Sequence, residues 1–440
     1  MVPLHPVLSS RIFDSFKRAP FSILSRFILV LLVCTASAAG QKILIPMDLK
    51  QNDHLKAYGV AFKALEKDVN VEWLLNYRGG SFMMNYSEEV ENDCLVRGVT
   101  MQALTAPEIM EIYRIISEEN MEAILLEKAP RIAVYTPPDK KPWDDAVTMA
   151  LEYAEIRYDK IFDLEVLQGR LSEYDWLHLH HEDFTGQYGK FFSIYAQAPW
   201  YQQQQKDYEA FARQMGFAKV SKEKLAVVRM MKDYVANGGF LFAMCGATDS
   251  FDIGLAAQNT DICETMYDGD PADPSANDKL DYSQTLAFTG FKAEMNPYAY
   301  EFSDIDHPSN LIARLKTPEE DYFTLFDFSA KYDPVPTMLI QNHVSAVKGF
   351  MGQTTGYRRS LIKDPIVIMG EDASIGAAKY IHGNFGKGMF TFYGGHDPED
   401  YAHAVGDPPT DLALHKNSPG YRLILNNILF PAAKKKPQKT

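Results

Sequence analysis

Three groups of reactive side chains stand at the ends of apolar, strand-like runs. In an open α/β sheet, sites lie at the carboxyl ends of the strands, so side chains in these positions are the first candidates for chemistry. The groups are Cys245 after residues 240–244, His180 and His181 at the end of residues 175–180, and His396 after residues 389–393. A thiol, several imidazoles and nearby carboxylates are the side chains that a hydrolytic site needs.

Cys245 stands in a sequence typical of a nucleophile elbow, because an apolar strand precedes it and the small residues Gly246 and Ala247 follow it. A helix that begins there would lower the pKa of the thiol, and the amide of Gly246 would help to hold an oxyanion. Thr248 and Asp249 are further candidate substrate contacts. A small buried cysteine at a strand end gives the same pattern, so both interpretations stay open.

His396 is the candidate general base, since it follows the strand at residues 389–393 in a Gly-Gly-His turn. We expect it to emerge at the same sheet edge as Cys245 and to accept the thiol proton. Asp397 or Glu399 would orient its ring. The alternative is an ordinary histidine in a glycine-rich loop.

The run from His178 to Asp183 offers a different chemistry. In a strand His178 and His180 share one face, and with Glu182 they are side-chain types that bind zinc or iron. The spacing matches no established zinc motif, so we expect no metal and no other cofactor. The favoured interpretation is that His180, His181 and Glu182 contact the substrate.

Apolar runs of strand length alternate with amphipathic helices, which predicts an α/β fold with a doubly wound, mostly parallel, flavodoxin-like sheet. The expected units are a signal segment at 1–38, an N-terminal βαβ lobe at 39–128, an α/β domain at 129–432 and a basic tail at 433–440. The polar, aromatic stretch at about 255–345 is expected to be an irregular insertion into the α/β domain.

The first 38 residues have the pattern of a cleaved signal peptide: basic residues, a short apolar run and an Ala-Ser-Ala site ending at Ala38. We therefore expect a periplasmic or secreted protein with no stable membrane span after cleavage. This segment has a net charge of +3, so the remainder lies near −17 rather than −14. Such a charge repels phosphate backbones and argues against nucleic acid as a partner.

Several of these motifs together resemble the class I glutamine amidotransferase-like superfamily, and within it the trehalose-utilisation (ThuA-like) branch. From residue 43 to Asn417 the chain is also similar to an exported Bacteroidota family that carries the name asparagine synthetase B. The chain has no cysteine directly after Met1 and no Ser-Gly-Gly-x-Asp-Ser loop, so its motifs do not support asparagine synthesis. The motifs that carry the first resemblance are residues 174–181, Asn237-Gly238-Gly239, the Cys245 elbow, Asp306-His307-Pro308, residues 385–389 and Gly395-His396-Asp397.

The leading expectation is an exported small-molecule hydrolase or amidase with Cys245 as nucleophile and His396 as base. Two alternatives remain. One is a periplasmic protein that binds a sugar or another ligand without turnover, with aromatic residues such as Tyr298, Tyr300 and Phe302 stacking on it. The other is a metal-dependent enzyme that uses the His178–Asp183 run.

Overall fold

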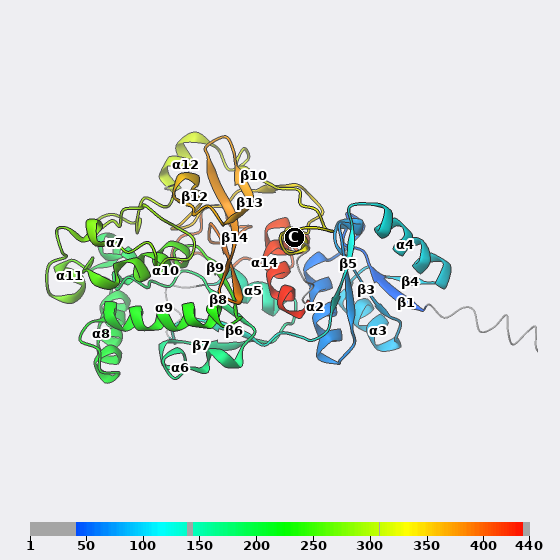
Figure 1. Ribbon diagram of the computed structural model, residues 1–440, viewed down its shortest axis with the longest axis horizontal. Coiled ribbons are helices and arrows are strands. Elements are labelled where there is room, and N and C mark those ends of the chain that lie inside the picture. The colour runs from blue at the N-terminus through cyan, green and yellow to red at the C-terminus, as the bar shows by residue number, and fades with distance from the viewer. Residues whose placement is uncertain (1–40, 139–143, 308, 434–440) are drawn as a thin grey trace, which may run out of the picture.

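The computed structural model describes residues 41–138, 144–307 and 309–433, and it contains two β-sheets (Figure 1). The expected signal peptide and nearly all of the basic tail lie outside these ranges. Among the described residues, no helix has the length and apolar character needed to cross a bilayer.

The N-terminal lobe is built on a five-stranded sheet with the strand order β4-β1-β3-β2-β5. Its elements are β1 (Lys42–Ile45), α2 (His54–Glu66), β2 (Val71–Leu75), β3 (Ser81–Asn85), α3 (Glu88–Arg97), β4 (Gln102–Leu104), α4 (Ala106–Glu118) and β5 (Glu122–Leu126). A βαβ unit would place β1 beside β2, but β3 lies between them and every neighbouring pair is antiparallel. The expected βαβ lobe is therefore wrong in its pairing.

The larger sheet has the strand order β11-β10-β13-β14-β15-β9-β8-β6-β7, with β12 paired to β14. Its strands are β6 (Ile132–Tyr135), β7 (Asp159–Ile161), β8 (Trp176–Leu179), β9 (Phe240–Met244), β10 (Tyr322–Leu325), β11 (Ala346–Lys348), β12 (Tyr357–Arg358), β13 (Val367–Asp372), β14 (Ala377–Phe385) and β15 (Gly388–Tyr393). Its helices are α5 (Ala146–Tyr153), α6 (Asp163–Leu167), α7 (Phe192–Tyr195), α8 (Pro199–Gln214), α9 (Val220–Ala236), α10 (Ala247–Ala256), α11 (Thr265–Asp268), α12 (Ser309–Leu315), α13 (Pro334–Leu339) and α14 (Pro419–Leu429).

The prediction of a flavodoxin-like, mostly parallel sheet is wrong, because this sheet is mixed. Strands β7, β6, β8, β9 and β15 are mutually parallel. Strands β14, β13, β10 and β11 continue the sheet from β15 with antiparallel pairings only. The physical reason is the short connections between β13, β14 and β15, because parallel neighbours need a crossover of a dozen or more residues.

The motif Gly386-Lys387-Gly388 lies where β14 turns into β15, and its two glycines have structural reasons. Gly386 has φ +61°, which favours glycine, and a Cβ on Gly388 would lie 2.1 Å from the carbonyl oxygen of Val235 in α9. The motif therefore packs the hairpin closely against the end of α9.

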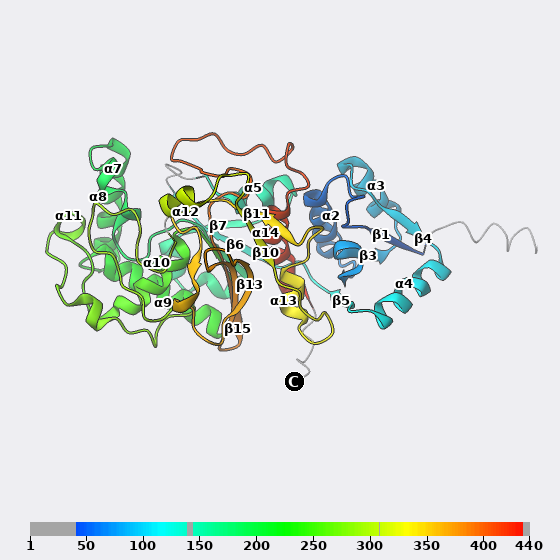
Figure 2. The same ribbon diagram turned by 90° about the horizontal axis from the view of Figure 1, so that it is seen from above.

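Both faces of the large sheet are buried, as the continuous apolar run in β9 predicts. Phe240, Phe242 and Met244 face a core that also contains residues of α2, α5 and α14. Leu241 and Ala243 face the second core, which contains residues of α9 and α10. Figures 1 and 2 show α14 between the large sheet and α2, so this helix joins the two lobes.

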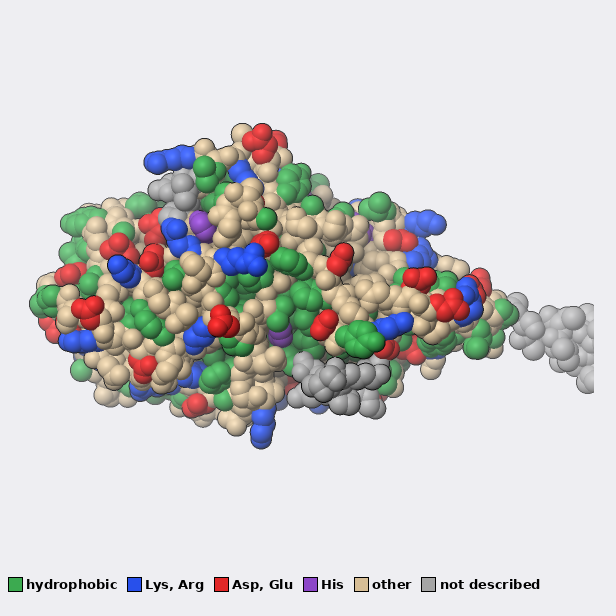
Figure 3. All heavy atoms as spheres, turned by 45° about the horizontal axis from the view of Figure 1, so that its top comes forward, with side chains coloured by type: hydrophobic (Ala, Val, Ile, Leu, Met, Phe, Trp, Pro, Cys, Tyr) green, Lys and Arg blue, Asp and Glu red, His purple; other side chains and the backbone are tan. Residues whose placement is uncertain are grey.

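Acidic and basic side chains are interspersed over the face of the molecule shown in Figure 3. The acidic excess of the sequence therefore does not form one continuous patch on that face.

Candidate functional site

The parallel strands bring the three predicted groups to one edge of the sheet. The register aligns Leu179 of β8 with Ala243 of β9, and Phe392 of β15 with the same Ala243. His180 and His181 follow β8, Cys245 follows β9, and His396 lies in the turn after β15. The expectation that these residues share an edge is confirmed.

A cavity of about 250 Å³ opens at this edge. Its polar lining includes the side chains of Cys245, His181 and His396. The aromatic and aliphatic part of the lining is formed by Phe191, Ile194, Tyr195, Tyr300 and Val405.

Cys245 occupies the sharp turn between β9 and α10 that the sequence predicts. Its φ is +51°, in the left-handed region that non-glycine residues rarely adopt. Such strained positions cluster at functional sites, and this one matches a nucleophile elbow.

The thiol itself is buried and is held by backbone amides. The N–H of Gln353 donates to Sγ at 3.3 Å, and the pKa of Cys245 is raised to about 11 because burial outweighs the backbone hydrogen bonds from Thr354, Gln353 and Gly246. Gly352 lies close to the Cys245 thiol and to the backbone of His396, because a Cβ there would be 3.0 Å from Sγ and 2.8 Å from the backbone nitrogen of His396. The sulfur is thus a thiol at neutral pH.

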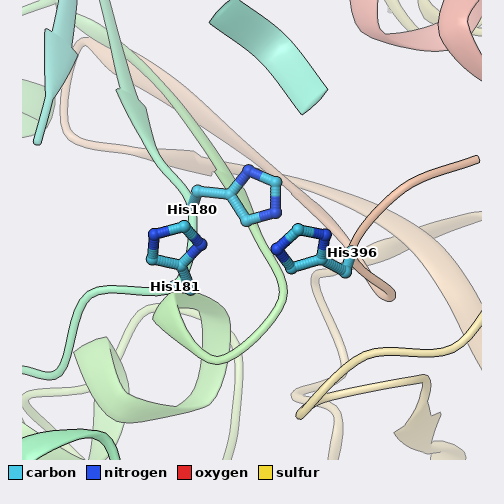
Figure 4. Close-up of side chains that lie close together, drawn as sticks. All are labelled: His180, His181 and His396. Carbon is cyan, nitrogen blue, oxygen red and sulfur yellow. The ribbon is translucent and has the colours of Figure 1, made fainter. Parts of the chain in front are cut away.

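His180, His181 and His396 form a cluster of imidazoles in which one nitrogen of each ring lies within 4.8 Å of the others (Figure 4). The ring centroids of His180 and His396 are 4.5 Å apart, and those of His180 and His181 are 4.8 Å apart. Among the described residues, Nε2 of His180 and Nδ1 of His396 are buried without a hydrogen-bond partner. Burial, reinforced by the neighbouring imidazoles, holds the pKa of His181 and of His396 well below the usual range.

The carboxylate of Asp145 contacts the cluster through His180. It accepts from Nδ1 of His180 at 3.1 Å and lies 3.2 Å from Nε2 of His178. It also caps α5 by accepting the N–H of Val147 at 2.7 Å. Burial alone would raise the pKa of Asp145, but attraction to His178 and His180 lowers it well below the usual range.

A second carboxylate-supported imidazole stacks on His396. His403 lies with its ring centroid 4.4 Å from that of His396, and its two nitrogens bond to Asp144 and Asp400 at 2.8 Å each. The hydrogen bond to Asp144 raises the pKa of His403 to about 9, against the effect of burial. The group of Asp144, His403 and Asp400 therefore carries a net negative charge at pH 7.

The predicted orienting carboxylates do not reach His396. Asp397 accepts from Thr410 Oγ1 at 2.7 Å and from the Tyr421 hydroxyl at 2.9 Å, and Glu399 lies 3.0 Å from the ring of His415. No hydrogen bond joins either carboxylate to the His396 ring among the described residues.

Of the six predicted substrate contacts only His181 lines the cavity, and Glu182, Thr248 and Asp249 support the site instead. Glu182 accepts the N–H of His180 at 2.9 Å, and burial raises its pKa to about 8. Thr248 donates to the Cys245 carbonyl at 2.7 Å, and Asp249 accepts from Thr354 Oγ1 at 2.9 Å. All three are buried.

The sequence interpretation did not include Asp145 or His403. The pair Asp144-Asp145 directly before a helix is a recognisable N-cap signal, but its contact with His180 depends on the pairing of β6 with β8. His403 lies in an irregular segment with no periodic pattern, so nothing local indicates that it reaches His396.

Comparison with known proteins identifies no family: no family model and no curated protein matches the chain. Among solved structures, a cytoplasmic protein from Salmonella typhimurium matches with 12% identity and a TM-score of 0.34, over 69% of this chain and 100% of its own. A second one, from Salmonella typhimurium LT2, has 13% identity and a TM-score of 0.35 over the same shares. An exo-β-1,4-mannosidase from an Opitutaceae bacterium has 12% identity and a TM-score of 0.26, over 60% of this chain and 31% of its own. With TM-scores below 0.5, these likenesses carry no argument about fold or activity. The resemblance to the amidotransferase-like superfamily stays a prediction.

Proposed function

We propose that this protein is a hydrolase that adds water across an ester, amide or similar bond of a small molecule in the cavity beside β8, β9 and β15. The observation that carries the proposal is the convergence of three buried imidazoles, from His180, His181 and His396, of which His181 and His396 line the cavity. The low pKa of His181 and of His396 keeps both rings neutral at pH 7, so that a proton can pass to either ring from an attacking water, although the low pKa also makes them weaker bases than an ordinary imidazole.

The cavity also supports a small substrate. Its volume of about 250 Å³ lies near the lower end for small-molecule sites, which run to about 300–1,000 Å³. The side chains of Tyr195 and Tyr300 give it an apolar wall, which suits a substrate with an apolar face. Export to the periplasm, expected from residues 1–38, belongs to the same proposal, and the net charge of −14 disfavours nucleic acid.

A second mechanism is favoured by the left-handed φ of Cys245. In it, Sγ attacks a carbonyl carbon, an imidazole takes the thiol proton and passes it to the leaving group, and water then cleaves the thioester. The raised pKa of Cys245 and the bond of Sγ to the Gln353 amide favour direct attack by water instead.

The test is a screen of ester, amide and glycoside substrates, followed by variants measured on the best substrate. His396→Ala is expected to lower kcat/KM about 100-fold or more, since a positioned base contributes roughly 10²- to 10⁴-fold. Cys245→Ala is expected to keep most of the activity. His415→Ala, which removes an imidazole outside the cavity, serves as the matched control.

Different outcomes separate the alternatives. Loss of activity in Cys245→Ala together with an acyl-enzyme detected by mass spectrometry would favour the covalent mechanism. A ligand that raises the melting temperature of the wild type but is never turned over would make the chain a binding protein and contradict the proposal.

A further inference from the structure

The convergence of three imidazoles is more specific than a general base requires. One neutral histidine is enough to deprotonate water, whereas the site gathers nitrogens of His180, His181 and His396 within 4.8 Å of one another (Figure 4). Three imidazoles with one remaining open position are the ligand set of catalytic zinc sites. We propose that these three side chains bind one divalent transition-metal ion, with zinc as the expected ion; its catalytic role rests on the proposed hydrolase function, whereas its binding does not.

The geometry is close to what a metal needs. Zinc–nitrogen distances of about 2.1 Å place tetrahedral ligands ~3.4 Å apart, so the rings have to close by a small movement. Nε2 of His180 and Nδ1 of His396 are buried and lack hydrogen-bond partners among the described residues. Burying an imidazole nitrogen without a hydrogen-bond partner costs free energy. Coordination of a metal ion would remove that cost for the nitrogen that binds the ion.

The carboxylates behind the cluster match the pattern found around metal-bound histidines. Asp145 accepts from Nδ1 of His180 at 3.1 Å, which fixes the tautomer that presents Nε2 to the cluster. On the other side, His403 links Asp144 and Asp400 and stacks on His396. The carboxylates of Asp145, Asp144 and Asp400 favour a cation at the cluster, whereas the His403 ring, whose pKa is raised, opposes one.

The other imidazole groups nearby are less suited to hold the ion. Both nitrogens of His403 already bond to carboxylates, and the nitrogens of His178 bond to Asp145 and to the carbonyl of Phe242. The group of Asp144, His396 and His403 also lines the cavity, but it contains only one imidazole, that of His396, that is not already held by two carboxylates.

The open position fits the proposed reaction. A metal-bound water loses a proton to solvent at neutral pH, and the resulting hydroxide attacks the carbonyl carbon of the substrate. The bond to the leaving group then breaks, and the leaving amine or alkoxide takes up a proton from solvent. One water is consumed, and no oxidant or reductant is required.

The experiment uses the full chain purified without an affinity tag. After chelation and dialysis, it is titrated with Zn²⁺ by calorimetry and with Co²⁺ by visible absorption. We expect one tight equivalent and the absorption bands of a four-coordinate Co²⁺ site. His180→Ala and His396→Ala are expected to weaken Zn²⁺ binding by more than about 100-fold, because losing a ligand costs more than losing a supporting partner. His415→Ala is the control that keeps the affinity.

A folding check and a second variant at His396 ensure that a loss of binding can be interpreted. Circular dichroism shows whether each alanine variant folds, and His396→Gln serves where His396→Ala does not. Micromolar Zn²⁺ that fails to bind, or binds equally well to folded His180 and His396 variants, overturns the metal site. Full hydrolysis by the metal-free chain overturns the catalytic role of the metal while leaving the proposed function intact. Tight binding without hydrolysis of any substrate leaves the metal site standing and contradicts the hydrolase.

Discussion

At the scale of single residues, Asp145 holds the candidate site in place through one carboxylate. It orients His180 and caps α5 by accepting backbone N–H groups. Asparagine can still cap α5 but does not carry the carboxylate charge that faces His180. Asp145→Asn therefore tests how Asp145 orients the His180 ring while the N-cap of α5 is kept. We expect a 10- to 100-fold loss of Zn²⁺ affinity, about 1.4–2.7 kcal/mol, with little change in the free energy of unfolding. Asp53→Asn, at the N-cap of α2, is the matched control, and an unchanged Zn²⁺ affinity in Asp145→Asn would contradict this role.

Gly352 is the residue whose side-chain size most directly affects the site. An added Cβ would lie 2.8 Å from the backbone nitrogen of His396, which is fixed by its own hydrogen bond to Met351. Gly352→Ala must therefore displace the turn that carries His396, at a cost of roughly 1–3 kcal/mol. We expect Zn²⁺ affinity to fall far more than stability, and Zn²⁺ calorimetry beside urea unfolding checks this. Equal losses in Gly352→Ala and in Gly356→Ala, where the nearest atom is 3.3 Å away, would argue against a specific effect.

Chemistry-bearing residues are the part of the site that the sequence predicts best. Cys245, His180, His181 and His396 each follow an apolar run, and parallel strands bring their ends together. The roles of Asp397 and Glu399 were inferred from nearness in sequence, but a turn directs neighbouring side chains in different directions. Asp397 is turned to Tyr421 instead.

At the scale of elements, the local pattern predicts helices and strands better than their partners. The strands expected at residues 175–180, 240–244 and 389–393 are confirmed as β8, β9 and β15. The antiparallel extension through β10, β13 and β14 was missed because the apolar residues of these strands do not indicate with which neighbours, or in which direction, the strands pair. Pairing direction also depends on connection length, and the short turns between β13, β14 and β15 indicate antiparallel pairing.

Gly388 determines how closely β15 packs against α9. Because a Cβ there would lie 2.1 Å from the Val235 carbonyl oxygen and 2.3 Å from that of Gly239, backbone has to move in Gly388→Ala. We expect a loss of about 2–4 kcal/mol in the free energy of unfolding, at the upper end of overpacking effects. Urea titration measures it, with Gly356→Ala as the control. A loss of less than about 0.5 kcal/mol in the free energy of unfolding would mean that the β14–β15 hairpin can move away from α9 at little cost.

At the scale of the whole molecule, the two lobes meet at a buried group of neutral imidazoles and one guanidinium. His54 in α2 stacks on His343 at 4.3 Å, and Arg422 in α14 donates to Nδ1 of His343 at 3.0 Å. Burial, followed by the charge of Arg422, lowers the pKa of His54 to about 4 and that of His343 to about 3. A second positive charge in this group is therefore strongly disfavoured.

Acid should consequently weaken the junction between the lobes. Between pH 6.5 and about 4, His54 and His343 bind protons in the unfolded chain but stay neutral in the folded protein. The free energy of unfolding therefore falls as the pH falls through this window. From pH 7.5 to pH 5 the His343 contribution comes to about 1–2 kcal/mol after allowance for its partial exposure.

His343→Asn isolates this contribution, because asparagine still accepts the Arg422 hydrogen bond but does not titrate. His181 and His396 contribute a slope of the same sign, and they do so equally in the wild type and the variant. Urea unfolding at both pH values is therefore expected to show a smaller acid-induced loss in His343→Asn than in the wild type, by about 1–2 kcal/mol. Identical losses would mean that His343 takes up its proton in the folded protein, which would require Arg422 to move away from it and α14 to separate from α2.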